Sequence, residues 1–326
     1  MSDQSPDRQT VISVRQLRRV FKSRKSTVEA VAGIDLEVYA GEIFGFLGPN
    51  GAGKTTTLRM LATLMPPTSG EATVVGQDLR RHPGEVRRRI GYVGQRGGAD
   101  PEITARHELI FEARLYGMSR AEAQSRAAEL IVTLELESCA DRKISTYSGG
   151  QRRRLDVGVG LVHKPQLLFL DEPTTGLDPQ SRARMWDEVR QLRAEGTTVF
   201  ITTHYLEEAD ALCNRIAIID HGKIVAEGTP DELKRAVAGD LVTVGVSGDV
   251  EAALRLLQPQ PFVREASIDG SELRLYVDHG ETATPDILRL LDTAGLGLTT
   301  VALSRPSLDD VFLRSTGRSL RESDVA

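Results

Sequence analysis

The 326-residue sequence has few of the features that mark secreted or membrane-spanning chains. Its two cysteines, Cys139 and Cys213, lie far apart and outside any C-x-x-C pair, so we expect neither a disulfide framework nor a zinc site. Residues 293–304 form the longest stretch without Asp, Glu, Lys or Arg, far short of the roughly 20 apolar residues that span a bilayer. The polar N-terminus lacks the apolar core of a signal peptide. These absences predict a folded protein of a reducing cytoplasm that does not cross a membrane.

An excess of positive charge is also lacking. The chain carries 41 Lys and Arg against 46 Asp and Glu, a net charge of -5, which gives no general attraction to nucleic acid. Basic clusters at residues 18–25 and 80–89 are interpreted as solvated faces. Asparagine occurs only as Asn50 and Asn214, and neither begins the motif with which GTPases recognise guanine. No nucleic-acid partner is expected, and a GTPase is disfavoured.

The sequence does contain a phosphate-binding loop. An apolar run at residues 43–47 passes into an octet that fits the pattern G-x-x-x-x-G-K-[ST]. Its glycines let successive N–H groups face one point, Lys54 adds a positive charge, and the Thr55 hydroxyl suits Mg²⁺. A helix beginning near Lys54 directs its positive end to the same place. The residues predicted to bind the nucleotide here are Gly48, Pro49, Asn50, Gly51, Ala52, Gly53, Lys54, Thr55 and Thr56.

Strands and helices alternate along residues 11–238, which predicts a mostly parallel α/β sheet of the P-loop NTPase class. We expect an edge strand at 11–20, further strands at 30–38, 71–75, 90–93, 166–171 and 199–203, and a hairpin at 216–226. A helical subdomain is expected at about residues 97–164. Ser119 with Glu122, and Thr229 with Glu232, form capping boxes that begin helices. Residues 1–10 are interpreted as a disordered tail.

The pattern changes after residue 239. Segments at 241–246, 250–257, 263–268, 273–277, 285–294 and 298–303 predict the order β-α-β-β-α-β, which is ferredoxin-like. We therefore expect a small α+β accessory domain at residues 240–326. With about 150 residues per domain as a prior, two domains agree with the length of the chain.

Further polar motifs follow the phosphate loop in a fixed order. Gln95 follows a predicted strand, and Tyr147-Ser148-Gly149-Gly150-Gln151 precedes a predicted helix. Asp171 and Glu172 end a buried strand, Asp178 begins the next helix, and His204 follows the strand after it. Over residues 11–235 this set resembles the nucleotide-binding subunits of ATP-binding cassette (ABC) transporters.

The resemblance implies roles for individual residues in ATP hydrolysis. Glu172 is expected to polarise the attacking water, while Lys54 and His204 hold the outer phosphates and Gln95 reports nucleotide state to the membrane partner. Without this context His204 would be interpreted as a surface histidine. The residues implied as Mg²⁺ ligands are Thr55, Gln95 and Asp171.

The remaining roles concern the nucleotide and a second chain. Phe21 is implied to stack on adenine, with a core phenylalanine as the alternative. Ser148, Gly149 and Gly150 resemble the signature motif that caps the ATP of a partner subunit, and Asp178 is expected to link the two sites. Tyr147 stands where the family usually has leucine. Since the chain has one phosphate loop and one signature, the resemblance implies a homodimer.

The C-terminal residues narrow the resemblance. Residues 304–313, together with 146–150 and 205–210, resemble drug-resistance export ATPases of the daunorubicin-resistance type. This implies an antibiotic-export ATPase that works with a separate integral membrane permease on the cytoplasmic side of the cell membrane. The alternatives are an importer ATPase, an ABC ATPase acting on ribosomes or DNA, and a regulatory module without turnover.

Overall fold

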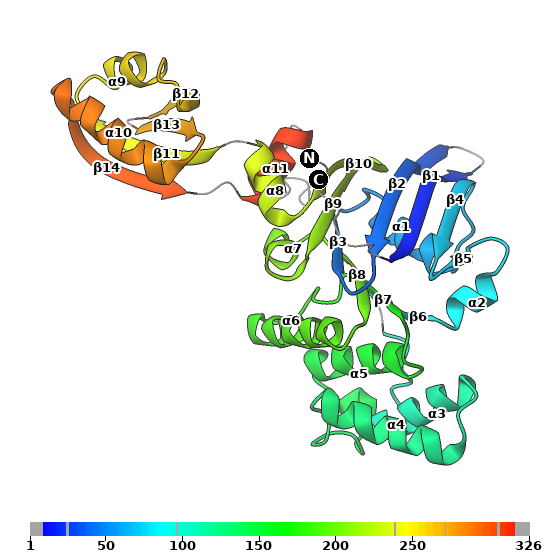
Figure 1. Ribbon diagram of the computed structural model, residues 1–326. Coiled ribbons are helices and arrows are strands. Elements are labelled where there is room, and N and C mark those ends of the chain that lie inside the picture. The colour runs from blue at the N-terminus through cyan, green and yellow to red at the C-terminus, as the bar shows by residue number, and fades with distance from the viewer. Residues whose placement is uncertain are drawn as a thin grey trace. The chain divides into compact units, whose positions relative to one another are not determined.

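A computed structural model describes residues 9–23, 26–95, 97–237, 239–270, 272–304 and 307–316. The chain divides into two compact units, Met1–Glu227 and Gly228–Ala326 (Figure 1). Most of the predicted N-terminal tail lies outside the described residues, and Thr10 already begins the first strand.

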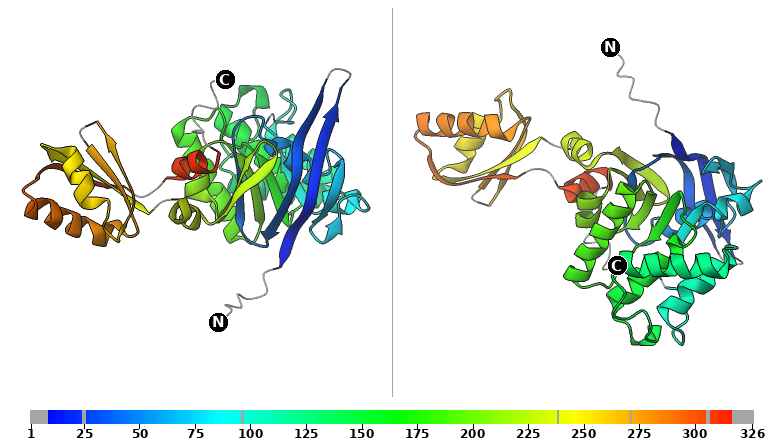
Figure 2. Two further views of the ribbon diagram at one scale, coloured as in Figure 1. Left: turned by 90° about the horizontal axis from the view of Figure 1, so that it is seen from above. Right: turned by 60° about the horizontal axis from the view of Figure 1, so that its bottom comes forward.

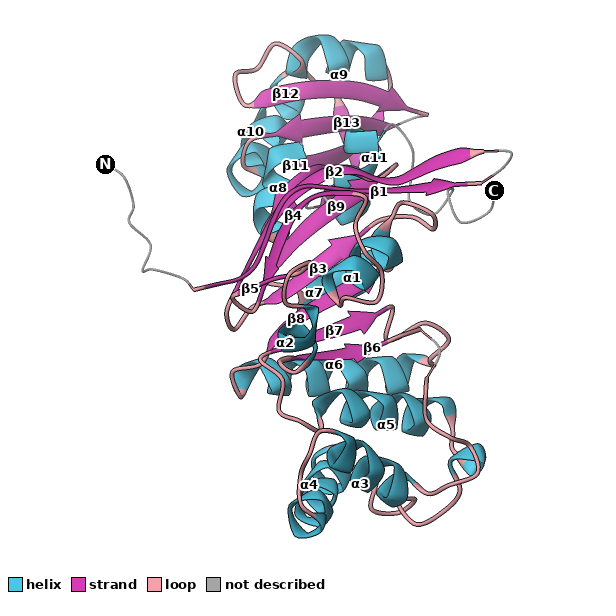
Figure 3. Cartoon of the chain, turned by 90° about the vertical axis from the view of Figure 1, so that its right-hand side faces the viewer, coloured by secondary structure: helices cyan, strands magenta, loops and turns pink. Residues whose placement is uncertain are grey.

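A six-stranded sheet forms the centre of the first unit. Its order is β10 (Lys223–Gly228), β9 (Arg215–Asp220), β3 (Ile43–Leu47), β8 (Thr198–Thr203), β7 (Leu167–Asp171) and β6 (Ile90–Val93). The strands from β9 to β6 are parallel, and Figure 3 shows β3, β8, β7 and β6 side by side. Every residue of β3, β7 and β8 is buried, as expected for parallel strands covered on both faces.

Aromatic packing joins the central strands. The ring of Phe200 on β8 lies 5.6 Å from the rings of Phe44 and Phe46 on β3 and of Phe169 on β7. All four side chains are fully buried, so they fix the relative positions of the strands whose ends carry the site.

A second, antiparallel sheet has the order β2 (Thr27–Tyr39), β1 (Thr10–Lys22), β4 (Ser69–Val74) and β5 (Gln77–Asp78). The prediction of an edge strand at residues 11–20 was wrong, because β1 pairs with β2 on one side and β4 on the other. Alternation of Ile12 and Val14 with polar residues identifies one buried face, but it carries no information about how many neighbours a strand has.

The helices of the first unit connect the strands of these sheets. They are α1 (Lys54–Leu61), α2 (Pro83–Arg87), α3 (Ala105–Leu115), α4 (Arg120–Thr133), η1 (Ile144–Thr146), α5 (Gly149–Leu161), α6 (Pro179–Ala194) and α7 (Leu206–Leu212). The predicted capping box of Ser119 and Glu122 is confirmed at the start of α4. Across the described parts of the chain, no helix combines the length and apolarity needed to cross a membrane.

The second unit contains the predicted β-α-β-β-α-β order, which is confirmed. Its elements are β11 (Asp240–Ser247), α9 (Val250–Leu257), β12 (Val263–Asp269), β13 (Glu272–Val277), α10 (Gly280–Thr293) and β14 (Gly297–Ser304). The strands form one sheet in the order β12-β13-β11-β14. Buried residues of β11 and β13, such as Val244 and Leu275, share a core with Ile287 and Leu291 of α10.

Two further helices belong to this unit. α8 (Pro230–Val237) begins with the predicted capping box of Thr229 and Glu232, and α11 (Leu308–Thr316) ends the described chain. They lie side by side (Figures 1 and 2) and contact each other. The predicted boundary at residues 238–240 placed α8 at the end of the cassette, and it would separate α8 from α11.

We predict that residues 228–326 fold without the rest of the chain and melt cooperatively. A fragment of residues 240–326 lacks α8, which contacts α11, and α11 carries the almost fully buried Val311 and Phe312, so we expect these side chains to become more exposed in the fragment. We expect it to melt at a lower temperature, since each lost buried side chain contributes about 1.5–3 kcal/mol. Circular dichroism melts of the two fragments test this. Equal melting temperatures would show that α8 does not stabilise the unit.

Candidate functional site

The parallel strands bring the predicted catalytic residues to one edge of the sheet. β3 ends at Leu47, β7 at Asp171 and β8 at Thr203, and these strands are adjacent and parallel. Gly48, Glu172 and His204 therefore follow the carboxyl ends of three neighbouring strands, which is where open α/β sheets bind ligands. β6 ends two residues before Gln95 on the same side.

The phosphate loop requires glycine at positions where its backbone approaches other chain segments. Gly53, immediately before α1, has a φ of 108°, and a Cβ there would lie 2.4 Å from the carbonyl oxygen of Ala30. A Cβ on Gly48 would lie 2.2 Å from the carbonyl oxygen of Ile219. Both contacts are shorter than any side chain allows, so substitution here would displace the loop.

Lys54 is buried within this loop. Its Nζ donates hydrogen bonds to the carbonyl oxygens of Gly48 at 2.6 Å and Pro49 at 3.0 Å, and lies 3.3 Å from Oε1 of Glu172. A phosphate oxygen accepts hydrogen bonds as these carbonyl oxygens do, and it carries negative charge as the Glu172 carboxylate does. We therefore expect a nucleotide phosphate to compete with Glu172 for Lys54.

The carboxylate of Glu172 contacts Gln95 and His204 in addition to Lys54. Its Oε2 accepts a hydrogen bond from Nε2 of Gln95 at 2.7 Å, and its Oε1 lies 3.4 Å from Nδ1 of His204. Burial alone would raise the pKa of Glu172, but His204 and Lys54 outweigh this effect and lower the pKa to about 2. The carboxylate is thus ionised at neutral pH.

The backbone at Glu172 is strained. Its φ is 45°, a left-handed value that L-residues seldom adopt, and its N–H donates to the carbonyl and hydroxyl oxygens of Thr202, each at 3.1 Å. Such conformations cost about 1–3 kcal/mol and cluster at functional sites.

Asp171 and Thr55 together fit a Mg²⁺ ion. The Thr55 hydroxyl donates to Oδ1 of Asp171 at 3.0 Å, and the Thr202 hydroxyl donates to the same atom at 2.7 Å. Oδ2 of Asp171 is buried without a hydrogen-bond partner among the described residues. An unpaired buried carboxylate oxygen beside a hydroxyl is a donor set that a hard cation favours.

Three predicted residues lie apart from this cluster. Ser148 is exposed at the start of α5, where it forms an unpredicted capping box with Gln151. Asp178 caps α6 by accepting hydrogen bonds from the N–H and hydroxyl of Ser181. Phe21 is 38% exposed, with the Arg19 guanidinium 4.7 Å from its ring centre. Ser148, Asp178 and Phe21 thus each make contacts within their own segment, with Gln151, Ser181 and Arg19.

Thr202 and Arg153 were not predicted as site residues from the sequence. Thr202 lies in a buried strand where its hydroxyl gave no separate signal. Arg153 lies within the run Arg152-Arg153-Arg154, which resembles a solvated face. Its spacing of four from Val157, another buried residue of α5, was a signal that could have identified it.

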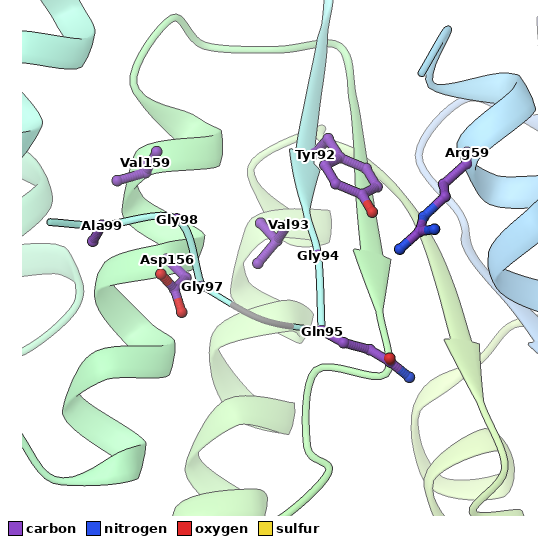
Figure 4. A pocket seen from close by; sticks show the side chains of 10 residues that line it. All are labelled: Arg59, Tyr92, Val93, Gly94, Gln95, Gly97, Gly98, Ala99, Asp156 and Val159. Atoms are coloured by element: carbon purple, nitrogen blue, oxygen red, sulfur yellow. The ribbon is translucent and has the colours of Figure 1, made fainter. Parts of the chain in front are cut away.

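A pocket of about 510 Å³ adjoins Gln95 (Figure 4). Along one side lie residues that follow β6, namely Gly94, Gln95, Gly97, Gly98 and Ala99, and Asp156 and Val159 of α5 line the wall behind them. Arg59 and Tyr92 lie on the other side. The pocket therefore has a carboxylate at one end and a guanidinium at the other, next to a residue that contacts Glu172.

A phosphate loop after β3, paired acids after β7 and a histidine after β8 define the class of ABC ATPases. The ABC transporter family matches residues 31–175, and the family described as "ATP-binding protein DrrA1-3-like, C-terminal domain" matches residues 228–316. The chain belongs to the ABC ATP-binding proteins of the daunorubicin- and doxorubicin-resistance type. It is therefore a nucleotide-binding ATPase subunit.

Three relatives and one solved structure illustrate this similarity. The chain is 44% identical to the daunorubicin resistance ATP-binding protein DrrA2 of Streptomyces coeruleorubidus, over 94% of this chain and 96% of that protein. It is 47% identical to DrrA of Streptomyces peucetius, over 88% of each chain, and 39% identical to the linearmycin resistance ATP-binding protein LnrL of Bacillus subtilis, over 90% and 95%. A dimeric ATP-binding cassette bound to ADP and phosphate covers 67% of this chain and 98% of its own, with 26% identity and a TM-score of 0.62.

We predict that Lys54→Ala and Glu172→Gln fail in different ways. At 4 Å two unit charges attract by about 4 kcal/mol in a partly polar site, so Lys54→Ala should weaken ATP binding sharply. Glu172→Gln keeps the size of the side chain, so it should bind ATP normally but hydrolyse it very slowly. Nucleotide titration and phosphate release measure the two effects, with a melting curve of each variant as the control for folding. Hydrolysis by Glu172→Gln at the unmodified rate would contradict the role of Glu172.

Proposed function

We propose that this chain hydrolyses ATP to energise export of a drug-like or lipophilic compound through a separate membrane protein. The observation that carries the proposal is similarity over both units, since resistance ATP-binding proteins align with about nine tenths of the chain. A soluble ABC ATPase or an importer ATPase is the alternative, and neither is favoured by a specific feature of the site. The proposed location is the cytoplasmic face of the membrane, where the chain would be peripheral.

Within the site, we assign the chemistry to Glu172. Glu172 would orient the attacking water and accept its proton, while Lys54 and His204 would contact the outer phosphates. When phosphate takes Lys54 away from Glu172, the carboxylate loses one cation that lowers its pKa, and it becomes a better base. Phe21 would stack on adenine once Arg19 moves aside.

A bound Mg²⁺ would neutralise charge on the phosphates. We assign Thr55 and Asp171 as residues that hold it, on the basis of the unpaired Oδ2 of Asp171 and the hydrogen bond from Thr55 to Oδ1 of the same carboxylate. We add Gln95 on the basis of the family resemblance.

We propose that a second copy of the chain completes each site. Ser148 and Gly149 are exposed at the N-terminal end of α5, where N–H groups and the helix dipole favour an anion. The cassettes of similar fold described as dimeric support this arrangement. Within one chain, a Cβ on Gly150 would lie 2.9 Å from Oγ of Ser181, three residues after Asp178. Gly150 of the signature thus lies against the segment that follows Asp178, the residue that we expect to link the two sites.

Mixed dimers test this sharing directly. A dimer of a Ser148→Arg chain and a Lys54→Ala chain keeps one intact site if phosphate loop and signature come from different chains. The same two substitutions placed in one chain, with an unmodified partner, destroy both sites. We predict that the first dimer hydrolyses ATP at about half the unmodified rate and that the second is inactive. The reverse ranking would show that each chain is a complete site, so the test separates the two arrangements.

We propose that the membrane protein contacts this chain at the pocket beside Gln95. Gly98 lines it, has no atom within 4 Å of an added Cβ, and has an ordinary φ, so a tryptophan there can fill the pocket without strain. Gly84 of α2 is a matched control, because it also has open space and lies outside the pocket.

We predict that Gly98→Trp abolishes ATP-driven transport yet changes the ATPase rate of the isolated chain by less than about twofold. The measurement is ATP-dependent uptake of a fluorescent lipophilic cation by inverted membrane vesicles that hold the chain and its membrane protein. Glu172→Gln should stop this uptake, and Gly84→Trp should leave it unchanged. If ATP drives no movement of lipophilic compounds in any vesicle, the export proposal is wrong. Normal transport by Gly98→Trp would overturn only the assignment of the pocket.

A further inference from the structure

Arg153 is a buried cation that the proposed chemistry leaves without a role. It lies on α5, four residues after the exposed Gly149, and is only 7% exposed. Its guanidinium donates three hydrogen bonds, and all three acceptors are backbone carbonyl oxygens. Nε donates to Pro173 at 2.8 Å, Nη1 to Gly94 at 2.6 Å and Nη2 to Asp171 at 3.1 Å.

The three carbonyls flank the two residues that face the reaction. Gly94 immediately precedes Gln95, while Asp171 and Pro173 lie on either side of Glu172. Gln95 and Glu172 are themselves joined by the 2.7 Å hydrogen bond between Nε2 and Oε2. One side chain therefore holds the backbone on both sides of the strained Glu172 and next to its hydrogen-bond partner.

We propose that Arg153 is a positioning residue that fixes Glu172 and Gln95 in their reactive geometry and ties them to the signature helix. A left-handed residue persists only where surrounding contacts over-determine it, and the bonds to Asp171 and Pro173 supply such contacts. Because α5 begins at the signature, a shift of that helix on binding the partner's nucleotide would act on Glu172 through Arg153. The inference rests on the proposed role of Glu172 in hydrolysis.

The geometry requires arginine rather than any cation. The planar guanidinium presents donors in three directions, whereas a lysine ammonium is a shorter point charge on a flexible stem. Burial lowers the pKa of Arg153, but the carboxylates of Asp156, Asp171 and Glu208 favour its charged form. Arg153→Lys thus keeps a basic side chain and removes most of the bracing.

Arg154 provides the matched control. It is the next residue of α5, its side chain is 11% exposed, and it pairs with the acidic side chains of Glu135 and Glu188 rather than with backbone near the site. Arg154→Lys can retain these ion pairs. Both variants thus replace a similarly buried arginine by lysine on one helix, and only one touches the catalytic segments.

We expect Arg153→Lys to lower the rate of ATP turnover by about tenfold to a hundredfold, since small displacements of reacting groups have effects of this size. Its affinity for ATP should stay within about twofold of the unmodified protein, because the phosphate loop is untouched. Arg154→Lys should change neither quantity by more than about twofold. Arg153→Gln, which is neutral, should likewise lower the rate of turnover while leaving the affinity for ATP nearly unchanged. Equilibrium binding of a fluorescent ATP analogue and single-turnover hydrolysis measure the two quantities for the full-length chain.

A double variant distinguishes a positioning role of Arg153 from a general loss of stability of the fold. In the Glu172→Gln protein, adding Arg153→Lys should lower the residual rate by less than about threefold, because residues that act as a unit are not additive. A multiplicative loss would show that Arg153 acts elsewhere and would overturn the inference. If Glu172→Gln hydrolyses ATP slowly, equal hydrolysis rates for Arg153→Lys and Arg154→Lys would also overturn the inference about Arg153. If Glu172→Gln hydrolyses ATP normally, the proposed role of Glu172 fails first.

Discussion

Lys54 and Glu172 bring opposite charges within 3.3 Å of each other at a place where each side chain is less than a tenth exposed. Leaving one member of such a buried pair without its partner costs about 3–5 kcal/mol, so the two positions constrain each other. The loop that holds Lys54 needs glycines at 48 and 53, and the turn that holds Glu172 needs the bonds of Thr202 and Arg153. A nucleotide that takes over Lys54 therefore changes the surroundings of the whole site.

Much of the site was predictable because its signals are local in sequence. Lys54, Asp171 and Glu172 each belong to short motifs at the end of an apolar run, and parallel strands place such ends at one edge. Local capping patterns likewise located the starts of α4, α6 and α8. The β-α-β-β-α-β order of the second unit followed from the change of hydrophobic period along the chain.

Other features depend on contacts between distant residues and could not be predicted in this way. β1 alternates like an edge strand, yet it is interior because β4 joins it from about 60 residues later. α8 follows the cassette in sequence but packs with α11, and the C-terminal family match also begins at residue 228. Arg153 is one of three consecutive arginines, and although its helical spacing from Val157 marks it as buried, its bonds to Gly94 and Pro173 depend on contacts that the local sequence does not show.

We propose that each nucleotide lies between Lys54 of one chain and the signature of another. The structure of the Glu172→Gln protein with Mg-ATP tests it most directly. We expect two chains that enclose two nucleotides, with each γ-phosphate contacted by Lys54 of one protomer and Ser148 of its partner. A single chain that encloses ATP with Ser148 out of contact, or a phosphate that leaves Lys54 on the carbonyl oxygens of Gly48 and Pro49, would contradict it.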